Sequence, residues 1–179
     1  MRTVLDRIYL AAGSLSAICI LTICVIVTMQ VVFNLITKLL GTQFAYTIPS
    51  YADFAGFLLA AASFLALSYT LKHDGHIRVT LFRDMIKGPI GHLIEITTLL
   101  ICAAGAVFMT YSMFGHLMES IEYGDVSTGI IPIPLWIPQS TLLLGLALFT
   151  LALIDNTVIA ILGKKPPAID DIKEEHLDV

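Results

Sequence analysis

The sequence predicts an all-α integral membrane protein with four transmembrane helices and both chain ends in the cytoplasm. Hydrophobic residues make up 57% of the chain and charged residues only 13%, whereas soluble domains average about 45–50% and about 25%. The apolar residues fall into four long runs, and the segments between the runs hold most of the charge. One soluble domain of this size cannot bury so much apolar surface, so lipid must cover part of it.

The four apolar runs are each long enough to cross a bilayer, which takes about 20 helical residues. The expected spans cover residues 8–36, 51–71, 90–118 and 135–162, within a transmembrane domain of residues 1–163. The first run has no charged residue from Ile8 to Thr37. Because a cleaved signal peptide has an apolar region of only about 7–15 residues, we interpret this run as a retained helix.

The positions of the basic residues predict the orientation. Every Lys and Arg except Lys38 lies before the first span, between the second and third spans, or after the fourth. These three regions share one side of the membrane only if the chain crosses it four times. Since positively charged loops stay in the cytoplasm, we expect both termini and the middle loop on that side.

The middle loop and the C-terminal tail differ in character. Ile77, Leu81 and Met85 recur every four residues, and the charged residues of this segment fall largely on the other side. This pattern predicts a short amphipathic helix over about 76–87 that lies in the membrane interface. Residues 164–179 are rich in charge and poor in large apolar side chains, which is typical of a disordered cytoplasmic tail.

Two amides lie on one face of the first span, because Gln30 and Asn34 are four residues apart. Amides that face lipid are costly, and hydrogen bonds between helices relieve the cost. Both interpretations stay open: the amides pack within this bundle, or they contact a partner subunit. At the start of the second span, Ser50 and Asp53 have the spacing of a capping box.

Glu95 lies about one turn inside the third span, where an unpaired carboxylate is costly and usually has a role or a partner. One interpretation is a proton relay or an ion pair with a partner subunit. The other is a carboxylate near the inner head groups that pairs with Lys87 or another local cation. Asp155 occupies a similar depth in the fourth span, and the same alternatives apply.

The sequence offers no arrangement of residues for catalysis. The three cysteines lie in apolar runs without metal-ligand spacing. His92 and His116 are about 36 Å apart along one helix, so they cannot bind one haem together. A nucleotide-binding P-loop is absent, and no basic stripe suggests nucleic acid. We therefore expect no enzyme, cofactor or metal, and we expect one subunit of a larger machine, because the paired broken helices of a complete transporter are missing.

The order of several short motifs resembles the small membrane subunit of tripartite ATP-independent periplasmic (TRAP) transporters. The resemblance covers roughly residues 5–160. Its motifs are Val32-Phe33-Asn34 at the end of the first span, Asp53 at the start of the second, Gly75-His76-Ile77-Arg78-Val79 in the middle loop, Ser127-Thr128-Gly129 in the outer loop, and the segment Pro132–Pro138. The chain departs from the family at Gln30, where relatives often have Arg, and at Thr80, where they often have Asp.

The resemblance implies a non-catalytic subunit of a sodium-coupled transporter in the bacterial inner membrane. Such a subunit is a scaffold for a large membrane subunit that carries the substrate and sodium sites. A periplasmic binding protein delivers the substrate, typically an organic acid. The alternative from the residues alone is a stand-alone membrane protein with four spans, such as a small channel or exporter.

The candidate site residues form two groups. Those expected to contact the large subunit are Gln30, Asn34, Asp53, His76, Arg78 and Glu95. Those expected to dock the periplasmic binding protein are the acidic residues Glu119, Glu122 and Asp125 near the outer loop. The alternative for the acidic group is a solvated loop without a partner.

Overall fold

The computed structural model describes residues 2–41, 46–72 and 89–162. Its helices are α1 (Arg2–Leu40), α2 (Tyr51–Lys72), α4 (Pro89–Tyr123) and α5 (Trp136–Ile161). All four are long and apolar enough to cross a membrane, which confirms the predicted all-α class with four transmembrane helices, whereas the orientation stays a prediction. The predicted interfacial helix over 76–87 and the tail 164–179 lie outside the described residues.

The edge helices α1 and α4 run past their predicted spans. They have 39 and 35 residues, which correspond to about 58 and about 52 Å at 1.5 Å per residue. The prediction ended each span at its charged residues, but Arg, Lys and Glu are good helix formers. Helix α1 therefore includes Arg7 and Lys38, and α4 includes Glu122. Both helices exceed a hydrocarbon core of about 30 Å, so they must tilt or project beyond it.

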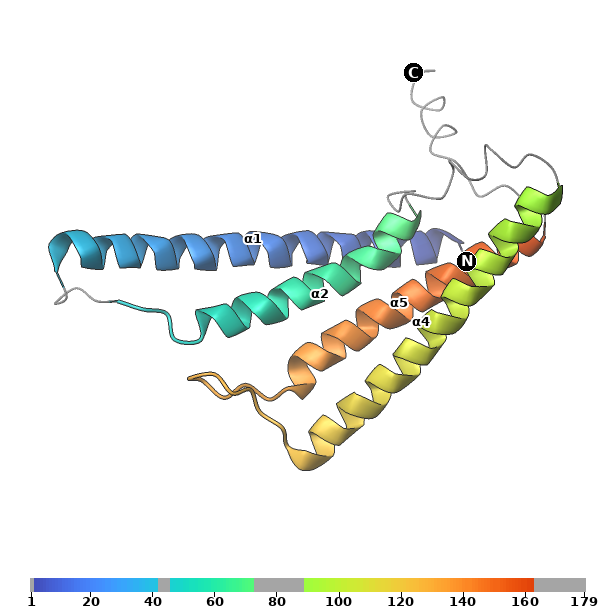
Figure 1. The fold of residues 1–179 in the computed structure, drawn as a ribbon. Helices are drawn as coiled ribbons and strands as arrows, with labels where there is room; N and C mark the ends of the chain where they lie inside the picture. Colours follow the sequence, from blue (N-terminus) through green and yellow to red (C-terminus); the bar gives the residue numbers. More distant parts are fainter. Residues whose placement is uncertain (1, 42–45, 73–88, 163–179) are drawn as a thin grey trace, which may run out of the picture.

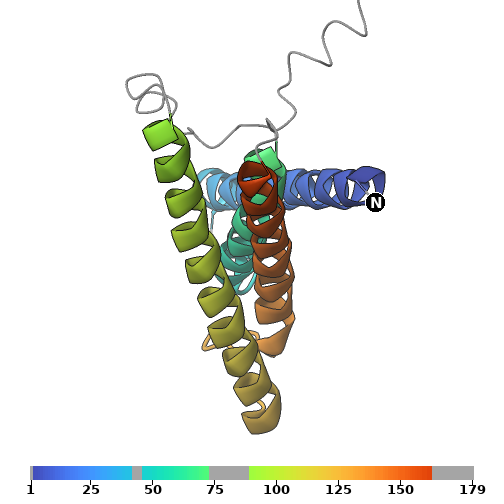
Figure 2. The ribbon, with the colours of Figure 1, turned by 90° about the vertical axis from the view of Figure 1, so that its right-hand side faces the viewer.

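The helices form an open row in the order α1, α2, α5, α4 (Figure 1). The extensive contacts are those of α1 with α2, α2 with α5, and α5 with α4. In Figure 2, α5 stands in front of α2 and beside α4, and α1 crosses behind them. Helices α2 and α5 are therefore the centre of the row, although they are far apart in the sequence.

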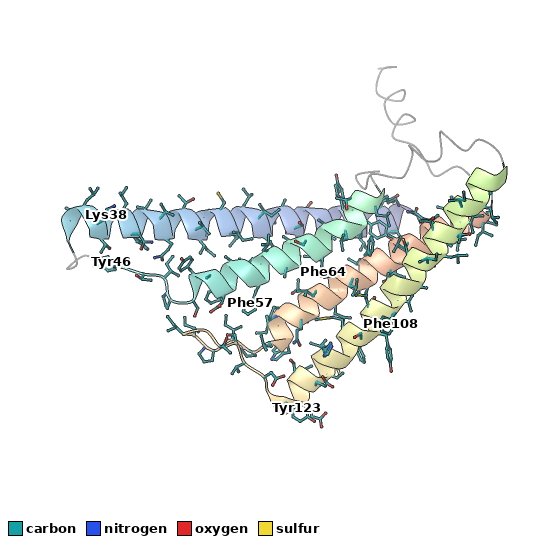
Figure 3. All side chains as sticks on the ribbon, viewed as in Figure 1. Lys38, Tyr46, Phe57, Phe64, Phe108 and Tyr123 are labelled. Carbon is teal, nitrogen blue, oxygen red and sulfur yellow. The ribbon has the colours of Figure 1, made fainter. Side chains whose placement is uncertain are left out.

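Each edge helix buries one narrow stripe. The buried residues of α1 are Tyr9, Ala12, Ser16, Cys19 and Gln30, and those of α4 include Ala103, Ala106, Leu117 and Ser120. Spacings that alternate between three and four residues place such a stripe along one seam against a single neighbouring helix. The other faces are exposed: Phe108 is 69% exposed and lies on the side of α4 away from α5 (Figure 3).

The central contact is a close approach of two backbones. A Cβ atom added to Gly145 of α5 would lie 2.6 Å from the carbonyl carbon of Phe64 in α2. Small residues also fill the neighbouring contacts: Cys19 meets Ala61 and Ala62 between α1 and α2, and Ala103 and Ala106 meet Leu153 between α4 and α5. Small side chains at helix contacts are typical of membrane proteins, because they let backbones approach.

The helices alternate in direction along the chain (Figure 1). One end of the row therefore carries the connections 41–50 and 124–135, and we call it the connector end. The other end carries the start of α1, the end of α2, the start of α4 and the end of α5, and we call it the terminal end.

Candidate functional site: junctions at the two ends of the helix row

At the connector end, the residue before α2 has an unusual backbone conformation. Ser50 has a φ of 56°, in the left-handed region that residues other than glycine rarely adopt. Its carbonyl oxygen accepts hydrogen bonds from the N–H groups of Asp53 (3.0 Å) and Phe54 (3.1 Å), which start the helix. Such a conformation costs about 1–3 kcal/mol and persists only where the surroundings fix it.

The surroundings that fix Ser50 come from the loop between α4 and α5. The N–H of Ile131 donates a hydrogen bond of 3.0 Å to Ser50 Oγ. A capping box would direct this hydroxyl to its own helix, whereas the structure uses it to attach a loop that is 81 residues away in the sequence. Gly129 lies over Asp53, since an added Cβ would be 1.9 Å from Asp53 Oδ2. We call Ser50, Asp53, Gly129 and Ile131 the connector junction.

The loop between α4 and α5 is also tied within itself. Val126 and Pro134 form an isolated antiparallel bridge. The N–H of Ser127 donates to the Ile133 carbonyl oxygen (2.8 Å), and the N–H of Ile133 donates to Ser127 Oγ (3.0 Å). Ile130 lies between these ties, and it is 81% exposed. In Figure 1 the loop projects past the start of α5 towards the start of α2.

The three acidic candidates lie at this same end. Glu119 is exposed, and its Oε2 is 3.4 Å from Nδ1 of His116 one turn earlier. Glu122 is exposed in the last turn of α4. Asp125 is exposed too, and its Oδ2 accepts a hydrogen bond of 3.3 Å from Ser120. The structure thus places all three carboxylates on the surface at the connector end, and their docking role stays a prediction.

Gln30 holds the connection between α1 and α2. Its side chain is buried; Nε2 donates to Asn34 Oδ1 (3.1 Å), and Oε1 accepts from the N–H of Ile48 (2.9 Å). Nearby, the rings of Phe33 and Tyr46 lie 6.2 Å apart. Gln30 therefore satisfies its amide within the chain. Asn34 is exposed, and its contact with a partner subunit stays a prediction.

At the terminal end, α1 and α2 are joined by charged and aromatic groups. Lys72 forms an ion pair with Asp6, and its Nζ lies 5.2 Å from the centroid of the buried Tyr9 ring. One turn further along α1, Gly13 faces Tyr69, because an added Cβ would be 2.8 Å from Cγ of that ring. We call Asp6, Tyr9 and Lys72 the terminal junction.

The remaining candidates cannot be placed in either junction. His76 and Arg78 lie outside the described residues, and for Glu95 the structure describes the backbone within α4 but not the side chain. Asp155 is half-buried in α5. No group of three His, Cys, Asp or Glu residues that could hold a metal ion occurs in the described part of the chain.

The sequence analysis named Ser127 and Gly129 only as part of a family-like motif, and it assigned no structural role to Asp6 and Lys72 as tie points or to Gly13 and Gly145 as contact points. For α1 a signal was present: Tyr9, Ala12, Ser16 and Cys19 alternate in spacing between three and four and include small residues. That pattern predicts the side on which another helix packs closely. For Gly129 no local signal was present, because its contact lies in another helix.

Four apolar helices in one open row, joined at both ends by contacts that hold no reacting groups, define a multi-pass α-helical membrane protein. A family model described as "Tripartite ATP-independent periplasmic transporters, DctQ component" matches residues 23–162. The chain belongs to this family, so it is the small membrane subunit of a TRAP transporter and is not an enzyme. Transporters of this family are tripartite, with a large membrane subunit and a binding protein. No curated protein matches the chain.

Proposed function

We propose that this chain is the scaffold subunit of a sodium-coupled TRAP transporter in the bacterial inner membrane. Its terminal end faces the cytoplasm, and its connector end faces the periplasm. It supports the large membrane subunit during uptake of an organic acid that a periplasmic binding protein delivers. The observation that carries this proposal is the open row of helices, in which the edge helices leave most of their surface uncovered.

The burial along the row supports a scaffold. In the apolar windows of α1 and α4, only 11% and 12% of the residues are buried within the chain, compared with 39% in α5. A stand-alone channel needs helices that close around a pore. A row that packs α1 and α4 along one seam each leaves their other faces available for lipid and for a partner. This arrangement favours a subunit over a self-sufficient channel or exporter.

The candidate contacts with the large subunit divide by exposure. Asn34 is exposed on α1, and we propose that its amide contacts the partner directly. Gln30 is buried, and the half-buried Asp53 packs against Gly129, so we propose that both act by holding the connections at the connector end. For His76, Arg78 and Glu95, the support is the family resemblance of their segments and the cost of a carboxylate in a span.

The charge at the connector end supports docking of the binding protein there. Glu119, Glu122 and Asp125 are exposed, and Lys38 is the only Lys or Arg described at this end. A surface with one sign of charge steers a partner of opposite charge, and salt weakens the attraction. The binding protein is therefore expected to present basic residues to this end.

Purification of the tagged chain from its native membrane tests the subunit assignment. We expect a large multi-span subunit to copurify in equal amount. We also expect the purified pair, in proteoliposomes with the binding protein, to take up an organic acid only when a sodium gradient is present. A chain that purifies alone or only with copies of itself would overturn the assignment. Uptake driven equally well without sodium would overturn the coupling.

Charge reversal tests the docking role of the three acids. The variant Glu119→Lys/Glu122→Lys/Asp125→Lys should slow association of the binding protein by about tenfold at low salt, and the difference should shrink as salt rises. The matched control is Asp170→Lys/Glu174→Lys/Glu175→Lys, which makes the same charge change in the tail. Equal association rates for the two variants would show that the acids are only solvated.

A further inference from the structure

We propose that Ile130, at the tip of the loop between α4 and α5, is the apolar anchor for a soluble partner at the connector end. The same geometry makes Ser50, Asp53 and Gly129 its positioning residues. The partner surface that fits is an apolar pocket with Lys or Arg at its edge. This inference rests on the proposed function, in which the connector end faces the periplasm and the soluble partner is the binding protein.

The tip is apolar, exposed and outside the helices. Ile130 is 81% exposed, and Val126 and Ile131 beside it are 51% and 40% exposed. The chain has no charged residue from Val126 to Pro138. Trp136 begins α5, and tryptophan at a helix end favours the membrane interface. Because the loop projects past this point (Figure 1), the tip lies on the water side, where an exposed isoleucine gains from burial by a partner.

The start of α2 also holds the tip in place, although the loop itself connects α4 to α5. The bond from the Ile131 N–H to Ser50 Oγ and the packing of Gly129 on Asp53 both attach it to the start of α2. Ser50 keeps a left-handed backbone at this point, and such strain is usually retained where it serves a site. A plain connection between α4 and α5 requires neither contact. A loop that is fixed before binding avoids the entropy cost of ordering it on binding.

The surrounding charge distinguishes a protein partner from lipid. Exposed carboxylates of Glu119, Glu122 and Asp125 lie in the last turns of α4, which lead into the loop, and just after that helix. Phosphate head groups would be repelled by them, whereas a protein pocket with Lys or Arg at its edge would be attracted. An apolar centre with a charged rim is the usual arrangement at protein–protein interfaces.

The first experiment measures binding of the purified binding protein to the complete membrane complex in nanodiscs. Ile130→Ala should raise Kd about tenfold, and Ile130→Asp should raise it further, because a central apolar anchor carries much of the binding energy. The matched control is Ile101→Ala, which truncates an isoleucine that is 68% exposed in the middle of α4. Its Kd should equal that of the wild type.

The outcomes separate this inference from the proposed function. If the wild-type complex binds the soluble partner and both Ile130 variants bind it equally well, the anchor is overturned while the subunit assignment stands. If the Ile130 variants lose the large subunit but not the binding protein, the tip serves the membrane partner instead, and the inference is also overturned. If the wild type forms no complex at all, the proposed function itself fails.

The second experiment tests positioning by a rescue. Gly129→Ala places a Cβ 1.9 Å from Asp53 Oδ2, so either the Asp53 side chain or the tip must move, and we expect a partial loss of binding, smaller than that of Ile130→Ala. The double variant Gly129→Ala/Asp53→Ala removes the nearer obstacle, although Ser50 Oγ remains 2.9 Å from the added Cβ, and it should recover part of the affinity. A double variant that binds as weakly as Gly129→Ala would overturn the positioning role. If Gly129→Ala blocks assembly, the Kd values of Ser50→Ala and Ser140→Ala are compared instead. Ser50 bonds to the tip, whereas Ser140 bonds to Ile137 at the start of α5. Only Ser50→Ala should then weaken binding, and equal Kd values would overturn the positioning role.

Discussion

The two central helices and the two edge helices of this chain are held in different ways. Between α2 and α5, the backbones approach so closely that Gly145 has no space for a side chain. Helices α1 and α4 are each attached to one neighbour along a single seam, and their other faces are exposed. The closest approach of two backbones therefore lies in the centre of the row, while the surface for lipid and partners lies at its edges.

The physical reason is the solvent. Lipid tails are as apolar as the side chains, so burial of apolar surface does not drive transmembrane helices together. Close packing and hydrogen bonds between helices must do so instead. The centre uses the close approach at Gly145. Among the described residues, hydroxyl groups form such bonds at both edges: Ser16 Oγ donates to the Ala62 carbonyl oxygen (2.8 Å), and the hydroxyls of Thr110 and Thr150 lie 2.9 Å apart.

The largest effect is expected for a substitution in the centre. Gly145→Ala puts a Cβ 2.6 Å from the Phe64 backbone, which cannot move without moving α2. We expect a loss of about 1–3 kcal/mol in the free energy of unfolding, measured by denaturation of the purified chain in detergent. The control is Gly105→Ala on α4, where nothing lies within 4 Å. Because alanine favours helix more than glycine does, this control should be neutral or slightly stabilising. Equal losses at the two positions would contradict the central role of the close approach.

A smaller effect is expected where the glycine of an edge helix faces a side chain. Gly13→Ala brings a Cβ to 2.8 Å from the Tyr69 ring, but a ring can turn aside while a backbone cannot. We expect a loss of about 1 kcal/mol, at the low end of the cost of overpacking. Gly13→Ala/Tyr69→Ala should show a favourable coupling in a double-mutant cycle. If Gly13→Ala cost as much as Gly145→Ala, the seam of α1 would be as rigid as the centre, and the comparison would fail.

Much of this fold follows from the sequence for a simple reason. A membrane span is a property of one segment, so the apolar runs alone give the number and order of the helices. The helices run beyond the predicted spans, because Arg7, Lys38 and Glu119, which bounded those spans, each continue a helix.

The row and its junctions do not follow from the sequence. Helices that are apolar on all sides give no periodic signal for the side that packs. The packing of α2 against α5 includes a close approach at Gly145. The pattern of apolar residues along the sequence does not reveal this contact. Likewise, Ser50 and Asp53 show the pattern of a local cap, yet Ser50 bonds to a loop 81 residues away. The polarity of Gln30 was enough to name it as a candidate. The residues with which it forms hydrogen bonds could not be predicted in the same way.

A modest effect is expected for the hydrogen bond that attaches α1. Ser16→Ala removes the bond to the Ala62 carbonyl oxygen and should cost about 0.6 kcal/mol, the average for such bonds between membrane helices. The control is Ser14→Ala: the Ser14 hydroxyl donates to Leu10 of its own helix (2.9 Å), so its loss should not loosen α1 from α2. Unfolding in detergent and cross-linking between α1 and α2 measure the two variants. A larger loss for Ser14→Ala would show that the seam depends on something other than this bond.

The smallest effect is expected at the terminal junction, where charge joins α1 to α2. The side chains of Lys72 and Asp6 are 29% and 47% exposed, and ion pairs at such sites contribute about 0–1 kcal/mol. Lys72 also lies over the Tyr9 ring, a contact that contributes about 0.5–1 kcal/mol where it is exposed. Lys72→Met should therefore destabilise the chain more than Asp6→Asn, since it removes both interactions. At 1 M salt, where the screening length falls to about 3 Å, the cost of Asp6→Asn should vanish while part of the cost of Lys72→Met remains. Equal costs for the two variants at every salt concentration would mean that the Tyr9 ring adds nothing. The charged contact at the terminal end would then be a solvated ion pair that adds little to the packing of α1 on α2.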